Sequence, residues 1–312
     1  MSRLILIPQY PVKLRYQEWW IQEFIEQYNQ YFDKVHVLGP VINTNNKGRE
    51  KESEFSPVEQ AIQYEIKQIS EYMKLELHPD DILLLNDLSF PGLFASVLFH
   101  KRPKRCYAFC HATAKNKYDL FQPVRGIKYP VEERMAQLFD GVFVGSEYHA
   151  RKLGWKNLYV TRLPNYPIWM RPKEITRTKD RLFACASRPS KQKVTKKIER
   201  ALEKRYDTKI YRPNASSWEE YFQFLQTSKY LLITSKEETY GYQVVDALMN
   251  GCIPLAPRKY SYPELLSDRF LYRDYHELVS KIESWRVKIP HLELPKETFF
   301  ATTAKIMRGQ HE

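Results

Sequence analysis

The sequence predicts an α/β protein of two domains, each a parallel sheet covered by helices. The 312 residues are enough for about two domains. Hydrophobic residues make up 43% of the chain, which is enough to build buried cores and excludes global disorder. Short apolar runs alternate with segments of helical spacing along the whole chain. This alternation is typical of parallel strands joined by crossover helices.

The first half of the chain carries five expected strands and three expected helices. Leu4–Ile7 is a short apolar run that fits a buried first strand, and Pro57 fits the first turn of a helix. The polar run at 43–56 has few apolar residues and predicts a loop. The expected strands are 4–7, 35–38, 81–85, 106–110 and 141–144, and the expected helices are 18–32, 57–75 and one that ends near 139.

The second half repeats the alternation after a charged segment, 169–180, that has no periodicity and is predicted to be a linker. The predicted domains are therefore 1–168 and 181–295, and a terminal helix within 296–312 is expected to pack back on the first domain. The expected strands are 181–186, 209–211, 230–234 and 253–256, and the expected helices are 193–206, 217–225, 242–249, 275–285 and 296–307.

Positive charge is concentrated in two windows of a chain whose net charge is +12. Residues 101–128 hold eight basic side chains and one acidic one, and residues 171–212 hold fifteen basic against five acidic. Two solvated faces would account for this, but such a concentrated field more often marks a phosphate or polyanion site. The 22 tyrosines and six tryptophans also suit a partner with phosphates and stackable rings.

Targeting and redox features point to a cytoplasmic protein, in the host cytoplasm if a phage encodes it. The N-terminal apolar run is too short for a signal peptide, and no stretch approaches the length of a membrane span. The four cysteines form no C-x-x-C pair and no set at zinc spacing, so we expect reduced thiols, mostly in the core.

The segment 234–266 (TSKEETYGYQVVDALMNGCIPLAPRKYSYPELL) is the most informative part of the sequence. Glu238 follows an expected strand, and Asp246 follows after seven residues, inside an expected helix. A carboxylate is an acceptor-only group and therefore suits a diol. The free amides at the N-terminus of that helix suit a diphosphate. A helix-start acid paired with an unrelated surface acid is the alternative interpretation of these two residues.

This segment resembles the donor-binding core of GT-B glycosyltransferases with the E-x(7)-E motif, which are retaining nucleotide-sugar enzymes. The resemblance implies two Rossmann-like domains that face each other across a cleft. It also implies that Glu238 binds the donor sugar and Asp246 the ribose, with Ser235, Tyr240 and Gly241 at the same donor site. Asp246 is one methylene shorter than the family glutamate. Thr239 and Tyr240 stand where the family has a glycine and an aromatic residue.

Two further matches extend the resemblance. Arg188 and Lys193 occupy the positions of a family Arg and Lys that clamp the donor diphosphate, and Ser187 replaces the family glycine. Paired cations there would stabilise the charge on the leaving diphosphate. His111 follows an expected strand, as does a family histidine near the donor sugar, although a lone histidine is more often structural. The glycine-rich turn after the first strand is missing, and 8–11 reads PQYP.

The acceptor is expected to be a nucleic acid, with double-stranded DNA as the first candidate. The segment around Gly251 looks similar to enzymes that act on nucleic-acid bases, such as the tRNA-queuosine mannosyltransferases and the phage enzymes that add sugars to DNA bases. Cations in the first window would neutralise phosphates, and aromatic residues among them would stack on an extruded base. The candidate acceptor residues are Lys115, Lys117, Tyr118, Arg125 and Lys128.

The resulting hypothesis is transfer of a sugar from a UDP-glucose-like donor to a hydroxyl on a modified DNA base, such as a 5-hydroxymethylpyrimidine. No D-x-D segment that would hold a metal-bound donor is present, so neither a metal nor another cofactor is expected. The catalytic candidates are Glu238 and His111, with Asp119 as the general base if the enzyme inverts. The alternatives are a lipid or polysaccharide glycosyltransferase on an anionic membrane, a tRNA-base glycosyltransferase, and a nucleic-acid-binding protein built on an inactive transferase.

Overall fold

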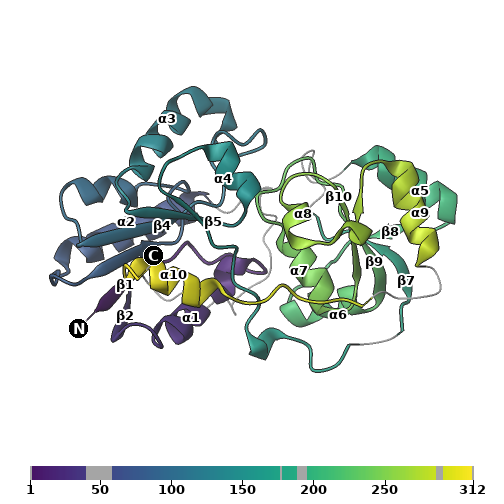
Figure 1. Ribbon diagram of the computed structural model, residues 1–312, viewed down its shortest axis with the longest axis horizontal. Coiled ribbons are helices and arrows are strands. Elements are labelled where there is room, and N and C mark those ends of the chain that lie inside the picture. Colours follow the sequence, from purple (N-terminus) through teal and green to yellow (C-terminus); the bar gives the residue numbers. More distant parts are fainter. Residues whose placement is uncertain (1, 40–57, 176–177, 188–194, 286–290, 311–312) are drawn as a thin grey trace. The chain divides into compact units, whose positions relative to one another are not determined.

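The computed structural model describes residues 2–39, 58–175, 178–187, 195–285 and 291–310. It divides the chain into two compact units (Figure 1). The first unit comprises Met1–Pro164 and Thr298–Glu312, and the second comprises Asn165–Glu297. Each unit contains one parallel sheet with helices on it, which confirms the predicted α/β class.

The first unit is built on a six-stranded sheet in the order β2-β1-β3-β4-β5-β6, and every paired strand is parallel. Its strands are β1 (Arg3–Ile7), β2 (Lys34–Val37), β3 (Ile82–Leu85), β4 (Arg105–Phe109), β5 (Gly141–Val144) and β6 (Leu158–Val160). Its α-helices are α1 (Tyr16–Tyr28), α2 (Val58–Lys74), α3 (Arg125–Ala136), α4 (Glu147–Leu153) and α10 (Phe299–Met307), and its short 3-10 segments are η1 (Phe94–Phe99) and η2 (Gln122–Val124).

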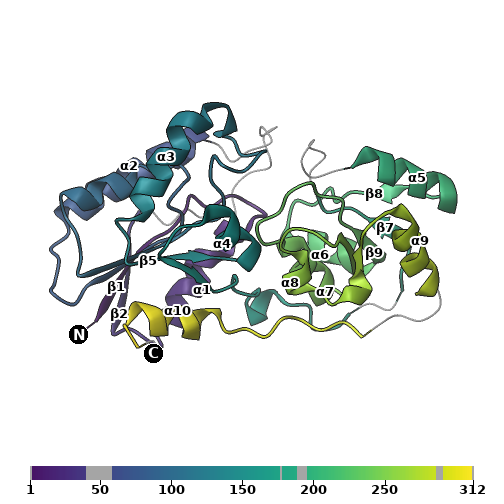
Figure 2. The ribbon, with the colours of Figure 1, turned by 45° about the horizontal axis from the view of Figure 1, so that its top comes forward.

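The helices of the first unit cover both faces of its sheet. The strand order reverses at β1, so right-handed crossovers place α1 on one face and α2 and α3 on the other. Figure 2 shows α10 beside α1. There Phe24 packs against Phe299 and Phe300, and the hydroxyls of Tyr28 and Thr303 are 2.8 Å apart. The last helix therefore completes a face of the first unit, although it follows the whole second unit in the sequence.

The second unit has a five-stranded sheet in the order β11-β10-β9-β7-β8, again parallel throughout. Its strands are β7 (Arg181–Ala184), β8 (Ile210–Tyr211), β9 (Ser228–Leu232), β10 (Ile253–Pro257) and β11 (Leu271–Tyr272). Its helical segments are η3 (Ile168–Met170), α5 (Lys196–Tyr206), α6 (Trp218–Gln226), α7 (Tyr242–Met249), α8 (Tyr262–Leu265), η4 (Asp268–Phe270) and α9 (Tyr275–Ser284).

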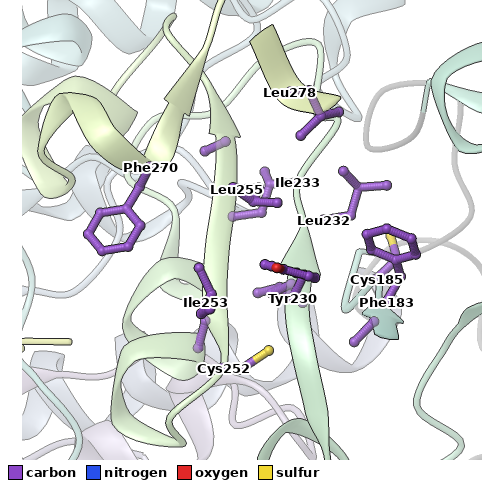
Figure 3. Packing of buried hydrophobic residues seen from close by; sticks show 14 of the residues in the cluster. Phe183, Cys185, Tyr230, Leu232, Ile233, Cys252, Ile253, Leu255, Phe270 and Leu278 are labelled. Atoms are coloured by element: carbon purple, nitrogen blue, oxygen red, sulfur yellow. The ribbon is translucent and has the colours of Figure 1, made fainter. Parts of the chain in front are cut away.

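The core of the second unit lies on both faces of β9 and β10 (Figure 3). Helices cover both faces of this sheet, so its strands are continuous apolar runs rather than alternating ones. Tyr230 is fully buried, and its hydroxyl donates to the carbonyl of Ile282 at 3.0 Å. Cys185 and Cys252 are buried and free in this core, as Cys106 and Cys110 are in the first unit. The expectation of core thiols is confirmed.

The chain enters the second unit at Asn165, before the predicted boundary at residue 168. The segment predicted to be a linker, as far as the structure describes it, is part of the second unit. Lys179 accounts for one of its charges, because the Nζ atom donates to the carbonyls of Gln226 and Gly251 at 2.6 and 2.9 Å. These carbonyls end two helices, where a cation is favourable. The predicted loop at 43–56 lies outside the described residues.

A buried ion pair at the start of the first sheet allows a test of the fold. Arg3 binds the fully buried side chain of Asp81 through two nitrogens, with the Nε–Oδ1 distance 3.0 Å. Asp81→Asn leaves the Arg3 guanidinium without its charge partner, and we expect the free energy of unfolding to fall by about 3–5 kcal/mol.

The neighbouring Asp80 provides the matched control for this prediction. Its side chain is 62% exposed and pairs with Lys104 at 3.5 Å. Asp80→Asn should cost about 1 kcal/mol or less, because exposed pairs contribute little. Urea unfolding of both variants measures the difference, and equal losses would contradict the structural role of the buried pair.

Candidate active site

The E-x(7)-D segment of the second unit begins in the loop after β9, at the carboxyl edge of its sheet, and ends inside α7. Gly241 precedes α7 with φ at 104°, a left-handed conformation that favours glycine. A Cβ atom there would lie 3.0 Å from Cε1 of Tyr262, so the close approach to this ring also requires glycine. The predicted Gly241 therefore shapes the turn that starts α7.

A chain of polar side chains joins the ends of two strands to the first turn of α7. Ser187, which follows β7, donates its hydroxyl to Oε1 of Gln243 at 2.9 Å. The Nε2 atom of Gln243 lies 3.4 Å from the hydroxyl of Tyr262 and 3.5 Å from Oγ of Ser235. Ser235 is thus buried among polar groups at the expected edge of the sheet.

Glu238 and Tyr240 occupy the loop before α7. Glu238 is half-buried, and its Oε1 accepts the backbone N–H of Thr239 at 3.1 Å. Tyr240 is buried, its carbonyl accepts the hydroxyl of Ser261 at 2.6 Å, and its ring packs edge-on against Tyr242. Tyr240 therefore anchors the loop, and Glu238 presents the carboxylate that is more open to solvent.

Asp246 lies one turn into α7 and is only 6% exposed. Its Oδ2 accepts the hydroxyl of Tyr221, on α6, at 2.7 Å. Its Oδ1 has no hydrogen-bond donor among the described residues. Burial raises the pKa of this carboxyl to about 7, although the hydroxyls of Tyr221 and Tyr166 lower it. The sequence did not indicate these tyrosines, because their approach to Asp246 is set by tertiary packing.

The predicted diphosphate ligands Arg188 and Lys193 lie outside the described residues, so their roles stay predictions. Beyond this segment, Thr195 is bound to Thr234 by two hydrogen bonds of 2.9 Å, one from its backbone N–H and one from its hydroxyl. The start of α5 is therefore tied to the end of β9.

His111 follows β4 in the first unit. Its ring is half-buried against Tyr16, Trp20 and Phe109. Its Nε2 lies 2.9 Å from the carbonyl of Asn86, and burial lowers the pKa to about 4. The imidazole is therefore neutral near pH 7. A carbonyl can only accept, so Nε2 carries the proton and Nδ1 is an acceptor.

A small, partly open pocket lies at the carboxyl ends of β1 and β3 in the same unit. Asp87 lines it and accepts three hydrogen bonds, from Nε2 of Gln9 and from the N–H and hydroxyl of Ser89. Burial raises the pKa of Asp87 to about 7. No sequence motif marks this pocket, although a polar pair at the end of a strand and the unusual 8–11 turn were signals of it.

The predicted acceptor residues divide into two groups. Lys115 donates to the hydroxyl of Tyr129 at 3.2 Å, and Lys128 donates to the carbonyls of Ser89 and Pro91 at 2.9 and 3.0 Å. These two cations serve the fold of the first unit. Three others are more open to solvent: Lys117 and Arg125 are exposed, and Tyr118 is half-buried with Nζ of Lys117 5.5 Å from its ring centre.

Much of the remaining charge of window 101–128 is also used internally. Lys101 donates to carbonyls at the end of α2, Arg102 pairs with Asp140 at 2.9 Å, and Arg105 donates to the carbonyl of Met307 at 3.1 Å. Cations at helix ends stabilise the fold. The density of charge in this window is therefore weaker support for a polyanion than the sequence alone suggested.

Asp119 closes a local turn. Its Oδ1 accepts the backbone N–H of Phe121 at 2.9 Å, just before η2. The structure therefore gives it a local backbone partner, and its role as a general base stays a prediction.

In the described parts of the chain, no group of three or more His, Cys, Asp or Glu side chains is arranged to hold a metal ion. No helix within the described ranges is long and apolar enough to cross a membrane.

Comparisons with known proteins identify the fold. No family model matches the chain. The lipopolysaccharide outer core galactosyltransferase WaaB superposes with a TM-score of 0.64 at 13% identity, over the whole of both chains. An alpha-glucosyltransferase in complex with UDP and a 13-mer DNA superposes with a TM-score of 0.55 at 10% identity, over 99% of this chain and 100% of that one. The chain therefore has the fold of the GT-B glycosyltransferases, as the sequence predicted.

One curated relative is similar over a short segment. The tRNA-queuosine alpha-mannosyltransferase of Drosophila melanogaster is 34% identical over 64 residues, which are 20% of this chain. The matching segment spans only 17% of the length of that relative.

The raised pKa of the buried Asp246 carboxyl predicts how the stability of the protein changes with pH. Its pKa is near 7 in the folded protein, above its ordinary value of 3.8, so the unfolded chain loses this proton at lower pH than the folded one. This residue therefore lowers stability as pH rises from about 4 to about 7. Asp246→Asn removes that dependence, so the variant should gain stability relative to the wild type between pH 5 and pH 8. Each unit of pKa difference corresponds to about 1.4 kcal/mol.

Urea unfolding at the two pH values measures this difference. A stability gap between wild type and variant that stays constant with pH would contradict the raised pKa of Asp246.

Proposed function

We propose that the chain is a retaining, nucleotide-sugar-dependent glycosyltransferase. The observation that carries this proposal is the carboxylate of Asp246, which is buried in register with the E-x(7)-D motif. Its Oδ2 accepts from Tyr221, and its Oδ1 has no donor within hydrogen-bond distance among the described residues. A ribose diol supplies the donors that this oxygen lacks. The GT-B fold and a neighbour solved with UDP support the same function.

The proposed roles follow from the positions of the side chains. Asp246 accepts ribose hydroxyls, Glu238 accepts hydroxyls of the donor sugar, and the N-terminus of α7 meets the diphosphate together with Arg188 and Lys193. The acceptor oxygen forms a bond to the anomeric carbon as the bond to the diphosphate breaks on the same face. The proton of the acceptor hydroxyl passes to the leaving phosphate, so this route needs neither a protein base nor a metal.

We propose a hydroxyl on a modified DNA base as the acceptor. Helix α5 supports this choice, because it buries Leu202 and exposes a row of cations to solvent, and such rows neutralise phosphates. The alpha-glucosyltransferase solved with DNA and the tRNA-queuosine relative are consistent with a nucleic acid. The exposed cations of α5 are Lys196, Lys197, Arg200, Lys204 and Arg205.

A second candidate acceptor is a lipid or polysaccharide at an anionic membrane. Helix α3 and the segment before it favour this candidate, because they expose apolar side chains beside Arg125. Ile127 is 76% exposed, and Val124 and Val131 are exposed by about half. An apolar stripe next to cations is typical of a helix that lies on a membrane surface. Sedimentation with anionic vesicles separates this candidate from the first.

Donor use is tested with labelled nucleotide sugars and duplex DNA that contains 5-hydroxymethylpyrimidines. We expect sugar transfer to the base with retained anomeric configuration, read by mass spectrometry and NMR of the digested nucleosides. Asp246→Asn should raise KM for the donor about tenfold or more, because it weakens the contact to the ribose. Transfer to a lipid or glycan, with none to any nucleic acid, would contradict the DNA acceptor.

The role of α5 is tested by salt-dependent DNA binding. Replacing Lys197, Arg200 and Lys204 by Ala should reduce the slope of log K against log salt by about 0.9 for each lost phosphate contact. Lys104→Ala is the matched control, because its charge is already paired with Asp80. An unchanged slope in the triple variant would show that α5 does not contact the acceptor.

A further inference from the structure

Helix α3 buries two charged side chains in the first unit. Lys128 and Glu132 are one turn apart on this helix, and their side chains are only 19% and 2% exposed. Glu133 and Arg134, by contrast, are exposed on the same helix. Burying a charged group is costly unless the group is paired or hydrogen-bonded. The atoms that Lys128 and Glu132 bind therefore indicate what these two residues do.

Lys128 binds the loop that follows β3. Its Nζ atom donates to the carbonyls of Ser89 and Pro91 at 2.9 and 3.0 Å. Ser89 is fixed in turn, because its backbone N–H donates to Oδ1 of Asp87 at 2.9 Å. One cation of α3 therefore attaches the helix to the loop at the carboxyl end of β3.

Glu132 binds the loop that follows β4. Its Oε2 accepts the backbone N–H of Ala114 at 3.0 Å, and its Oε1 lies 3.9 Å from Nζ of Lys128. Burial raises the pKa of Glu132 to about 7, although the N–H of Ala114 and the charge of Lys128 lower it. Ala114 is fully buried, so its N–H needs an acceptor within the protein. The carboxylate of Glu132 supplies this acceptor.

His111 lies between these two attachments. It follows β4, three residues before Ala114, and its Nε2 lies 2.9 Å from the carbonyl of Asn86 in the loop after β3. The hydroxyl of Ser89 is hydrogen-bonded to the carbonyl of Ala112, next to His111. The imidazole and the carbonyl that it contacts therefore belong to two loops that α3 holds together.

The contact with Asn86 decides which nitrogen of His111 carries the proton. Tyr16, Trp20 and Phe109 pack around the ring, but such contacts do not select a tautomer. A carbonyl selects one, because it can only accept. Moving the two loops apart by about 1 Å would take this contact beyond hydrogen-bond range. The tautomer of His111 therefore depends on the spacing of the two loops.

Stability alone does not explain a buried ion pair at this place. Apolar residues of similar volume are often at least as stabilising as a buried ion pair. The pair on α3 differs from an apolar contact because it binds backbone atoms of two loops in a defined geometry. This geometry indicates a role in placing the loops.

We propose that Lys128 and Glu132 are positioning residues, which hold the loops after β3 and β4 together and thereby fix the orientation and tautomer of His111. This inference rests on the proposed function, because the resemblance to GT-B enzymes gives His111 its role near the donor sugar. With Nε2 bound to Asn86, the imidazole offers Nδ1 as an acceptor, which suits a hydroxyl of that sugar. Lys128 and Glu132 act through His111 and do not touch substrate in this account.

Nitrogen-15 NMR of the histidine side chains in the full chain tests the inference without any substrate. The wild type should show a neutral His111 at pH 7 with its proton on Nε2. Lys128→Met keeps the aliphatic stem and removes the donors, and Glu132→Leu removes the acceptor of the Ala114 N–H. Each should move the His111 signals toward those of a mixture of the two tautomers. Glu132→Gln keeps an acceptor oxygen and should keep the proton on Nε2.

Activity provides a second measurement. Misplacing a group by about 1 Å can cost about a hundredfold in rate, so kcat should fall about tenfold or more in Lys128→Met and Glu132→Leu. UDP binding, which the proposed function assigns to the second unit, should stay as in the wild type. Glu133→Leu, at an exposed position on the same helix, is the matched control and should keep both the tautomer and kcat.

Urea unfolding is measured for every variant, and Lys128→Met carries the test if Glu132→Leu does not fold. A folded Lys128→Met or Glu132→Leu protein that keeps the proton of His111 on Nε2 would overturn the inference, whatever its loss of stability. Absent UDP binding or absent sugar transfer by the wild type would contradict the proposed function instead. The tautomer measurement would still decide the positioning role in that case.

Discussion

The candidate donor site depends on a buried carboxylate that the protein solvates only in part. Asp246 in the second unit is more than nine-tenths buried. Its Oδ2 accepts the hydroxyl of Tyr221, and its Oδ1 has no donor within hydrogen-bond distance among the described residues. Burial raises the pKa of this group to about 7. A ligand that donates hydrogen bonds would offset the desolvation cost that the buried carboxylate still has after folding.

The fold keeps such groups near the ligand by a simple constraint. In a parallel sheet all strands end at one edge, so the loops after those strands gather there. The Ser187–Gln243–Ser235 network stands at this edge in the second unit, and the Asn86–His111 contact stands there in the first. Glycine at 241 allows the chain to turn into α7 against the ring of Tyr262. Rigid strands thereby hold close together side chains that lie far apart in the sequence.

Local patterns predicted the regular parts of this structure. The runs 141–144 and 242–249 were predicted with the bounds that the structure has, because continuous apolar runs and helical spacing are properties of neighbouring residues. The short elements α4, β6 and β11 were not predicted. Strand β6 is half-buried at the edge of its sheet and has only three residues, too few for a clear pattern.

Partners brought together by tertiary packing could not be predicted in this way. Tyr221 reaches Asp246 from a different helix, and Gln9, after β1, donates to Asp87, after β3. The charge of Lys115 and Lys128 looked available for phosphates in the sequence, but carbonyls and a hydroxyl of the first unit already bind them. The composition gives the number of cations, and only the structure shows which of them face solvent.

The most direct measurement of the central claim is the titration of the Asp246 carboxyl by carbon-13 NMR with and without UDP. A ribose diol that donates to Oδ1 stabilises the ionised form. The account therefore predicts a pKa near 7 in the free protein that falls when UDP binds. UDP binding with no change in this pKa would show that Asp246 does not contact the nucleotide, and would contradict the account.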